Sequence, residues 1–228
     1  MKRRGIAVLV AGALCLLPNT VFAEGNIEVT HKNLIMDSED GSGVFYARVE
    51  NTGDAAVTFD EGQLIVYSET GEELYTEDYI VAIPQHVEMQ PGDYFYVKQT
   101  LWDTGLEGKT IGSYELVIEP QEADSSYHVD RFQCESSFEL TDSYDSNVYV
   151  TFSNDTDDKI QDFYVIGALY DQNDNLIFVS ESVYGTLTVH AGSMITDEMY
   201  IDSDTRDYFD ANGIVPTRSD GMVCTDWL

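Results

Sequence analysis

Histidine is the side chain best suited to acid–base or metal chemistry near neutral pH, and this chain has four, spread far apart. They are His31, His86, His128 and His190, and none stands at zinc-ligand spacing from another histidine or a cysteine. A Ser-His-Asp set needs no closeness in sequence, but the chain has no GxSxG stretch to present a nucleophile. The sequence therefore favours histidines in turns or on the surface. A hydrolase with dispersed catalytic residues stays open as an alternative function.

Residues 171–175, DQNDN, begin like the calcium loop of an EF-hand. That loop needs Gly at its sixth position and Glu at its twelfth, where this chain has Leu176 and Ser182. Asp and Asn also favour turns, because their side chains hydrogen-bond the local backbone. We interpret the stretch as a hairpin turn.

A second acidic cluster, made of Asp202, Asp204 and Asp207, stands beside the predicted start of a short helix at Ser203. Carboxylates at that place stabilise a helix N-terminus, and they do not complete the ligand set of a calcium site. We expect no cofactor and at most weak calcium binding at these three aspartates. A calcium-dependent adhesion module is a second alternative function.

The first residues of the chain have the pattern of a secretory leader. Three basic residues precede an apolar stretch at residues 6–17, and small residues lie at the positions that a signal peptidase reads before Glu24. The apolar stretch is short for a permanent membrane anchor. We expect residues 1–23 to be a signal peptide cut between Ala23 and Glu24, with an uncleaved anchor as the alternative. The predicted location is extracellular or at the cell envelope, with no membrane contact after cleavage.

Two cysteines, Cys134 and Cys224, remain after residue 23. An even pair in an exported chain suits a disulfide, because such bonds persist in oxidising compartments. Cys134 lies in the predicted first strand of the second half of the chain and Cys224 in its last strand. First and last strands run close together in immunoglobulin-like sandwiches, so we expect a disulfide between them. Two buried thiols are the alternative.

The charge of the chain is strongly negative. The leader holds three of the 11 Lys and Arg residues and no acid, so 11 − 3 = 8 bases face 42 acids and the formal charge becomes −34. Such a surface repels nucleic acid and anionic lipid, so we expect no nucleic-acid partner. It would attract cations or basic partners, although solubility alone is sufficient to account for it.

The rest of the chain has the pattern of an antiparallel all-β protein: short alternating apolar runs separated by Gly, Asp, Asn, Ser and Thr. Gly43–Asn51 alternates cleanly, whereas residues 64–67 are apolar on both faces and predict a strand buried on both sides. Residues 203–213 break the pattern, with a capping Ser at the start and Gly at the end. They predict one or two helical turns.

The second half of the chain repeats the first. One strand pattern ends in Asn51 and recurs, 103 residues later, ending in Asn154, and a Tyr lies 16 residues beyond each Asn. Pro91-Gly92 and Ala191-Gly192 then mark equivalent turns. We expect two tandem immunoglobulin-like β-sandwiches at residues 24–120 and 127–228, with a linker at residues 121–126 and the helix in the second.

Residues 167–171, GALYD, resemble the central motif of the FxLYD domain of secreted bacterial proteins. The upstream Asn154 and the downstream Ala191-Gly192 match the same family, and residues 64–68 match it more weakly in the first half. Gly167 stands where the family has Phe. The resemblance implies a small β-sandwich in an envelope-associated bacterial protein, without catalytic residues.

Aromatic side chains make up 12% of the residues, and 15 of them are Tyr. In strands most of them pack in the core or across strands, but exposed ones form platforms that bind glycans or proteins. Trp102 and Trp227, each near the end of a strand or of the chain, suit such a role. The sequence thus predicts a secreted, non-enzymatic binding or scaffold protein whose partner is an unidentified protein or glycan.

Overall fold

The computed structural model describes residues 25–37, 40–85, 88–123, 129–141 and 145–226, and it confirms the predicted all-β class with one short helix. Every paired strand is antiparallel to its neighbour. The elements of the first half are β1 (Ile27–Met36), β2 (Gly43–Asn51), β3 (Val57–Thr58), β4 (Gly62–Ser68), β5 (Glu73–Ile80), β6 (Tyr94–Leu101), β7 (Ile111–Ile118) and β8 (Gln121–Glu122). Those of the second half are β9 (Val129–Phe132), β10 (Cys134–Glu139), β11 (Asn147–Ser153), β12 (Phe163–Asp171), β13 (Leu176–Tyr184), β14 (Met194–Tyr200), α1 (Ser203–Asn212) and β15 (Pro216–Asp226).

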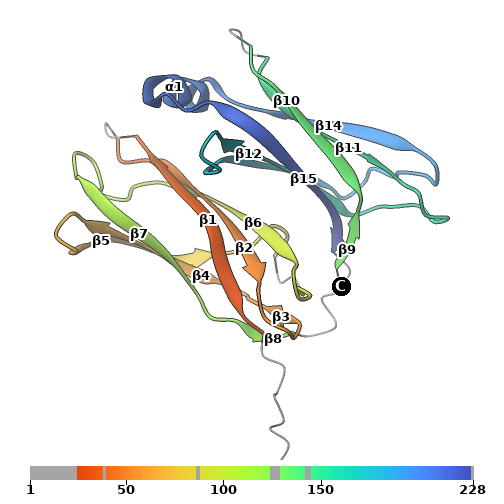
Figure 1. The fold of residues 1–228 in the computed structure, drawn as a ribbon, viewed down its shortest axis with the longest axis horizontal. Coiled ribbons are helices and arrows are strands. Elements are labelled where there is room, and N and C mark those ends of the chain that lie inside the picture. Colours follow the sequence, from red (N-terminus) through yellow and green to blue (C-terminus); the bar gives the residue numbers. More distant parts are fainter. Residues whose placement is uncertain (1–24, 38–39, 86–87, 124–128, 142–144, 227–228) are drawn as a thin grey trace, which may run out of the picture.

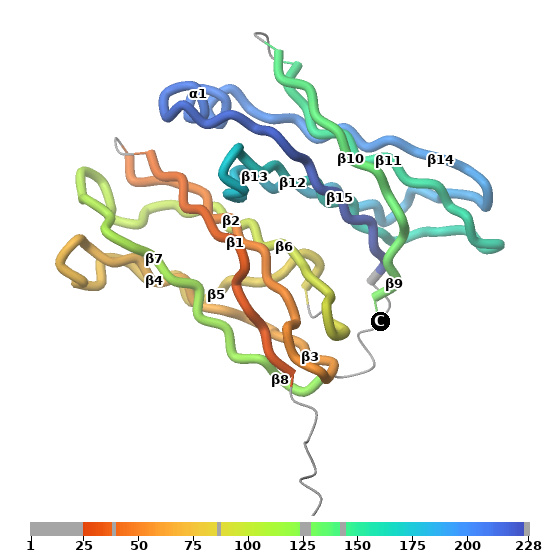
Figure 2. Tube along the Cα trace, in the orientation of Figure 1, coloured from red at the N-terminus to blue at the C-terminus, as the bar shows by residue number. Residues whose placement is uncertain are grey.

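The described residues form five sheets, of which one is the short pair β3-β8. The other four lie one above another, two from each half of the chain (Figure 1). Their strand orders, from one outer side to the other, are β5-β4-β7, β1-β2-β6, β13-β12-β15-β9 and β10-β11-β14. The two middle sheets come from different halves and contact each other through β13, which packs against β1, β2 and β6. Figure 2 shows the same order along the Cα trace. The halves therefore meet face to face.

A buried asparagine organises the same turn in each half. Asn51 has no exposed surface, and its Nδ2 donates to the carbonyls of Ala55 and Met89, at 2.8 and 2.9 Å. Asn154 is equally buried, and its Nδ2 donates to the carbonyls of Asp158 and Val189, at 2.7 and 2.9 Å. Each asparagine thus links the turn that follows its strand to a loop further along the chain. The repeated sequence pattern thus corresponds to the same set of hydrogen bonds in each half.

Strand β2 buries one face as its alternating pattern predicts, and it also buries the opposite face, which the pattern does not predict. Phe45, Ala47 and Val49 of β2 are fully buried within the first half. Tyr46, on the opposite face, is only 3% exposed, because the second half of the chain covers it. The tertiary stacking thus buries a face that a single sandwich would leave to solvent.

The expectation for residues 64–67 is wrong, because only Leu64 and Val66 of β4 are buried whereas Ile65 and Tyr67 are partly exposed. The sheet of β4 is an outer one, with its far face towards solvent. Its counterpart β12 is buried along almost its whole length, since its sheet lies between two others.

The helix and the linker also differ in detail from expectation. Asp202 rather than Ser203 caps α1, its Oδ1 accepting from the Thr205 N–H at 2.7 Å, and Gly213 ends the helix with φ 62°. Gln121 and Glu122, predicted as linker, form β8 and pair with β3. The described part of the chain contains no helix that is long and apolar enough to span a membrane.

Candidate ligand-binding cleft

A buried cluster of hydroxyl groups joins the two middle sheets. The Tyr96 hydroxyl donates to Asp220 Oδ2 at 2.7 Å and lies 2.9 Å from the Tyr170 hydroxyl, while Tyr94 donates to the same carboxylate oxygen at 3.0 Å. Burial raises the pKa of Tyr96 far above its usual value, and the neighbouring Tyr170 and Asp220 raise it further. These tyrosines therefore stay protonated and act as donors.

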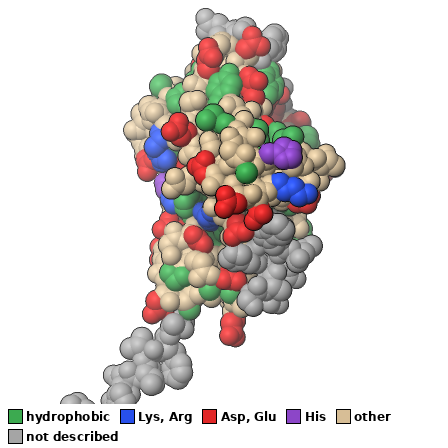
Figure 3. Space-filling model, turned by 90° about the vertical axis from the view of Figure 1, so that its right-hand side faces the viewer, with side chains coloured by type: hydrophobic (Ala, Val, Ile, Leu, Met, Phe, Trp, Pro, Cys, Tyr) green, Lys and Arg blue, Asp and Glu red, His purple; other side chains and the backbone are tan. Residues whose placement is uncertain are grey.

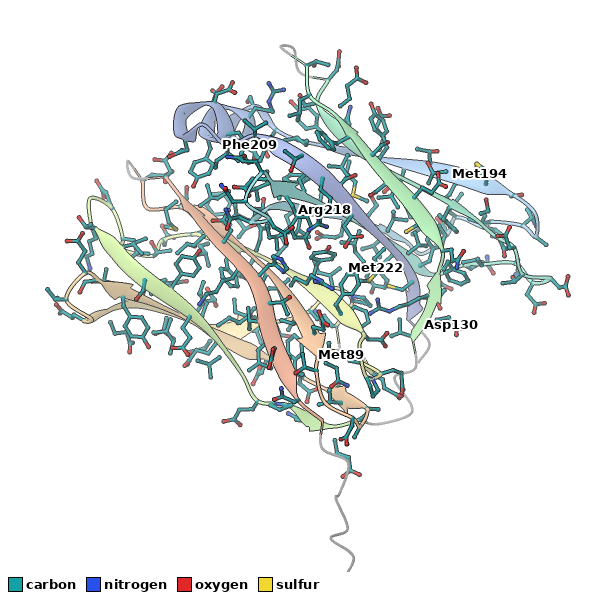
Figure 4. All side chains as sticks on the ribbon, in the orientation of Figure 1. Met89, Asp130, Met194, Phe209, Arg218 and Met222 are labelled. Atoms are coloured by element: carbon teal, nitrogen blue, oxygen red, sulfur yellow. The ribbon has the colours of Figure 1, made fainter. Side chains whose placement is uncertain are left out.

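Basic side chains gather at the same interface. Of the eight Lys and Arg residues that follow the leader, four lie there: Arg48, Lys98, Arg131 and Arg218. Lys98 Nζ lies 3.7 Å from Glu181 Oε2 of the other half, and Arg131 donates to the Tyr94 carbonyl across the interface. Figure 4 shows Arg218 between the two halves. In so acidic a chain, this placement neutralises carboxylates where the halves meet.

A cleft of about 600 Å³ lies at one end of this interface, between the first half and the start of α1. Volumes of this size are typical of small-ligand sites. Strands β1, β2 and β6 line it from one half, and β13, the end of β14 and α1 from the other. The cleft exists only because the halves are stacked, since neither half supplies both walls.

Aromatic side chains line much of the cleft. Trp102 is 68% exposed and Tyr200 is 47% exposed, which is unusual for such large apolar groups. Deeper in, Tyr46 packs against Phe178 with ring centroids 6.2 Å apart, and Tyr208 of α1 also lines the cleft. The cleft thus combines a buried aromatic base with two rings open to solvent.

The charged groups of the cleft are mostly acidic. Asp37, Asp202 and Asp204 line it, with Lys98 as the single base among the described lining residues. Burial raises the pKa of Tyr46, and the nearby carboxylates of Asp202 and Glu181 raise it further. The potential in the cleft is therefore negative.

Two of the three aspartates that the sequence suggested as weak calcium ligands lie in the cleft, and the third does not. Asp202 and Asp204 line the cleft, but Asp207 does not. Among the described residues, no group of three His, Cys, Asp or Glu side chains is arranged to hold a metal ion. Asp202 is engaged as the helix cap, where its Oδ2 also accepts from the Thr205 hydroxyl at 3.0 Å.

The interpretation of residues 171–175 as a turn agrees with the hydrogen bonds there. Asp171 Oδ1 accepts from the backbone N–H groups of Asn173 and Asn175, each at 2.8 Å, and Asp174 has a φ of 63°. Burial alone would raise the pKa of Asp171, but the hydrogen bonds from Asn175 and Asn173 lower it overall. The carboxylate is therefore satisfied by its own turn.

The structure shows no disulfide bond between Cys134 and Cys224, the pair that the sequence predicts to form one. Cys224 of β15 lies opposite Arg131 of β9, and the Arg131 guanidinium lies over the ring of Phe95 in the first half. The face of β15 that carries Cys224 is therefore the one next to the interface between the halves. Cys134 pairs instead with Phe152, in the core between the two sheets of the second half. Cys134 and Cys224 thus belong to different sheets, and their cross-strand partners lie on opposite sides of the sheet that contains β15. A sequence pattern of two distant strands could not reveal this placement.

The two histidines that the structure describes, His31 and His190, are not brought together. His190 is exposed in the turn before β14, while His31 lies at the interface, its Nε2 3.4 Å from Asp174 Oδ2. His86, His128, Trp227, Ala23 and Glu24 lie outside the described residues.

Sequence reasoning missed Asp37, Tyr46 and Tyr200 as neighbours. Asp37 and Tyr46 come from the paired strands β1 and β2 and their connection, whereas Tyr200 ends β14 in the other half. No protein-family model matches the chain, and no curated protein matches it. The resemblance of residues 167–171 to the FxLYD motif therefore stays a prediction.

Proposed function

We propose that this chain is an exported, non-catalytic binding protein of the bacterial envelope or extracellular space, and that the cleft between its halves is its ligand site. The observation that carries the proposal is the pair Trp102 and Tyr200, two large rings left open beside a cleft of about 600 Å³. Large apolar rings that stay exposed to solvent lose the favourable free energy that burial in a core would give them. A ligand that stacks on the rings recovers that contact.

Binding suits the polar groups of the cleft better than catalysis does. Asp202 is committed to the helix cap, and Lys98 is paired with Glu181 across the interface. Groups held in this way are suited to positioning a bound molecule. The leader pattern and the FxLYD-like motif support export, and the immunoglobulin-like nature of each half belongs to the same proposal.

The proposal is tested by binding measurements on the chain without residues 1–23. Neutral oligosaccharides and short peptides of differing charge are titrated by calorimetry into the protein and into Trp102→Ala. We expect a saturable ligand whose affinity falls in Trp102→Ala. Loss of stacking on one ring weakens such complexes by about 1 kcal/mol, which is roughly fivefold.

The matched control is Met194→Ala. Met194 is 67% exposed, so its truncation also removes an exposed apolar group, and it lies at the start of β14, far from α1 (Figure 4). The proposal fails if Trp102→Ala leaves every ligand unaffected, or if Met194→Ala weakens binding as much.

A further inference from the structure

The chemistry of the cleft is informative about its ligand, provided that the cleft is the ligand site as proposed above. Three carboxylates face one ammonium group there, and that ammonium, on Lys98, is already near Glu181. An anionic ligand would be repelled, both by the cleft and by the formal charge of −31 on the whole chain. Figure 3 shows acidic side chains scattered over another face of the molecule as well.

A buried tyrosine lies beside the acids of the cleft. Tyr46 lines the cleft and is only 3% exposed, and its ring packs against Phe178 of the other half. The carboxylates of Asp202 and Glu181 lie close enough to raise the pKa of Tyr46 beyond the effect of burial. Aromatic and acidic side chains are therefore neighbours in the cleft.

Elsewhere in the chain, tyrosine rings and carboxylates together hold the guanidinium groups of the chain's own arginines. The Arg218 guanidinium lies 3.6 Å from the ring centroid of Tyr170 and bonds to Asp174 Oδ1 at 2.5 Å. The Arg48 guanidinium lies 4.0 Å from the Tyr94 ring centroid and 3.2 Å from Glu50 Oε2. In each case an aromatic face and a carboxylate share one cation.

The cleft offers aromatic rings and carboxylates without an arginine of its own. We propose that it binds a basic segment of a partner polypeptide, with an Arg or Lys side chain entering between Trp102 and the carboxylate of Asp204. The aromatic faces attract the cation, the carboxylates neutralise it, and the acidic surface steers the segment to the cleft.

The test titrates an acetylated tetra-arginine peptide into the protein without residues 1–23, at low and at physiological salt. We expect Trp102→Ala to weaken binding about 3- to 30-fold, as loss of a partly desolvated cation–π contact implies. Asp204→Asn should weaken it about 2- to 5-fold, as for a surface ion pair.

Asp207→Asn is the matched control, because it removes the same charge from the same helix at a residue that does not line the cleft. We expect it to change the affinity by less than half as much as Asp204→Asn. Equal losses in these two variants would overturn the inference, since they would show attraction to the overall charge alone. Thermal melting verifies that each variant is folded, and Tyr200→Ala, at the second exposed ring, provides an independent variant of the cleft.

Other outcomes separate this inference from the proposed function. If a neutral oligosaccharide binds in a Trp102-dependent way and the tetra-arginine peptide does not, the basic partner is wrong while the cleft remains a ligand site. If neither kind of ligand depends on Trp102, both proposals fail.

Discussion

Replacing Tyr96 by Phe removes one hydroxyl group from the centre of the interface between the halves. A tyrosine hydroxyl has a single hydrogen, and that of Tyr96 is donated to Asp220 at 2.7 Å. The Tyr170 hydroxyl, 2.9 Å away, must then donate to the Tyr96 oxygen. The substitution Tyr96→Phe therefore removes one charge-assisted hydrogen bond and leaves the hydroxyl of the buried Tyr170 without an acceptor.

The expected cost follows from these two losses. A hydrogen bond to a charged group contributes about 1.5–3 kcal/mol, and an unsatisfied buried hydroxyl costs about 1–3 kcal/mol. Asp220 keeps its bond from Tyr94 at 3.0 Å, which limits the first loss. We expect Tyr96→Phe to lower the free energy of unfolding by about 2–4 kcal/mol, measured by urea denaturation of the chain without residues 1–23.

A double-mutant cycle distinguishes this mechanism from a general packing defect. Adding Tyr170→Phe removes the orphaned hydroxyl, so the double variant should cost less than the sum of the two single variants. Tyr200→Phe, which alters a half-exposed ring, is the control and should change stability by less than about 0.5 kcal/mol. Additive costs, or a loss below about 0.5 kcal/mol for Tyr96→Phe, would refute the assignment of Tyr96 as the donor that joins the halves.

Three further predictions concern the same framework. Asn154→Ala removes two side-chain hydrogen bonds, although the two carbonyls keep the Ile160 N–H and the Thr156 hydroxyl as donors. It should cost about 1–3 kcal/mol in urea denaturation, and a loss under about 0.5 kcal/mol would contradict the shared role of the turn. The pKa of Tyr96 is raised in the folded state, so its stabilisation is complete below the unfolded pKa of about 10 and is lost at higher pH. Stability should therefore fall above about pH 10, and Tyr96→Phe should show a shallower fall in denaturation at several pH values. Cys224 is fully buried, and burial with the nearby Asp220 raises the pKa of Cys134 to about 11, so neither thiol should be alkylated at pH 7 until urea unfolds the protein. Rapid alkylation of Cys224, detected by mass spectrometry, would show that its strand opens readily.

Much of the local structure was predictable because it depends on neighbouring residues. The alternation in Gly43–Asn51 specifies a strand, and the aspartates and asparagines of residues 171–175 form their own turn. Asn51 and Asn154 repeat because each satisfies carbonyls of one tight turn and of one nearby loop. Such contacts are encoded in the residue types themselves.

The cleft was not predictable in the same way. Asp202 and Asp204 were singled out as acids beside a helix start, but their relation to Trp102 arises only when α1 of one half reaches the end of β6 of the other. The placement of the two cysteines was not predictable for a related reason. Nearness of two strands is a matter of topology, whereas the face on which each side chain lies depends on register.

The two central strands show most clearly what the sequence determined and what the tertiary structure decided. Residues 64–67 and 164–170 are both apolar, and the sequence alone determined that both form strands followed by a turn. The stacking of the halves decided that β12 lies between two sheets and β4 on the outside. A chain can encode a strand through local alternation, but burial of the second face depends on which surface docks against it. Here that docking buries Tyr96 and Tyr170, and it leaves Trp102 open at the cleft.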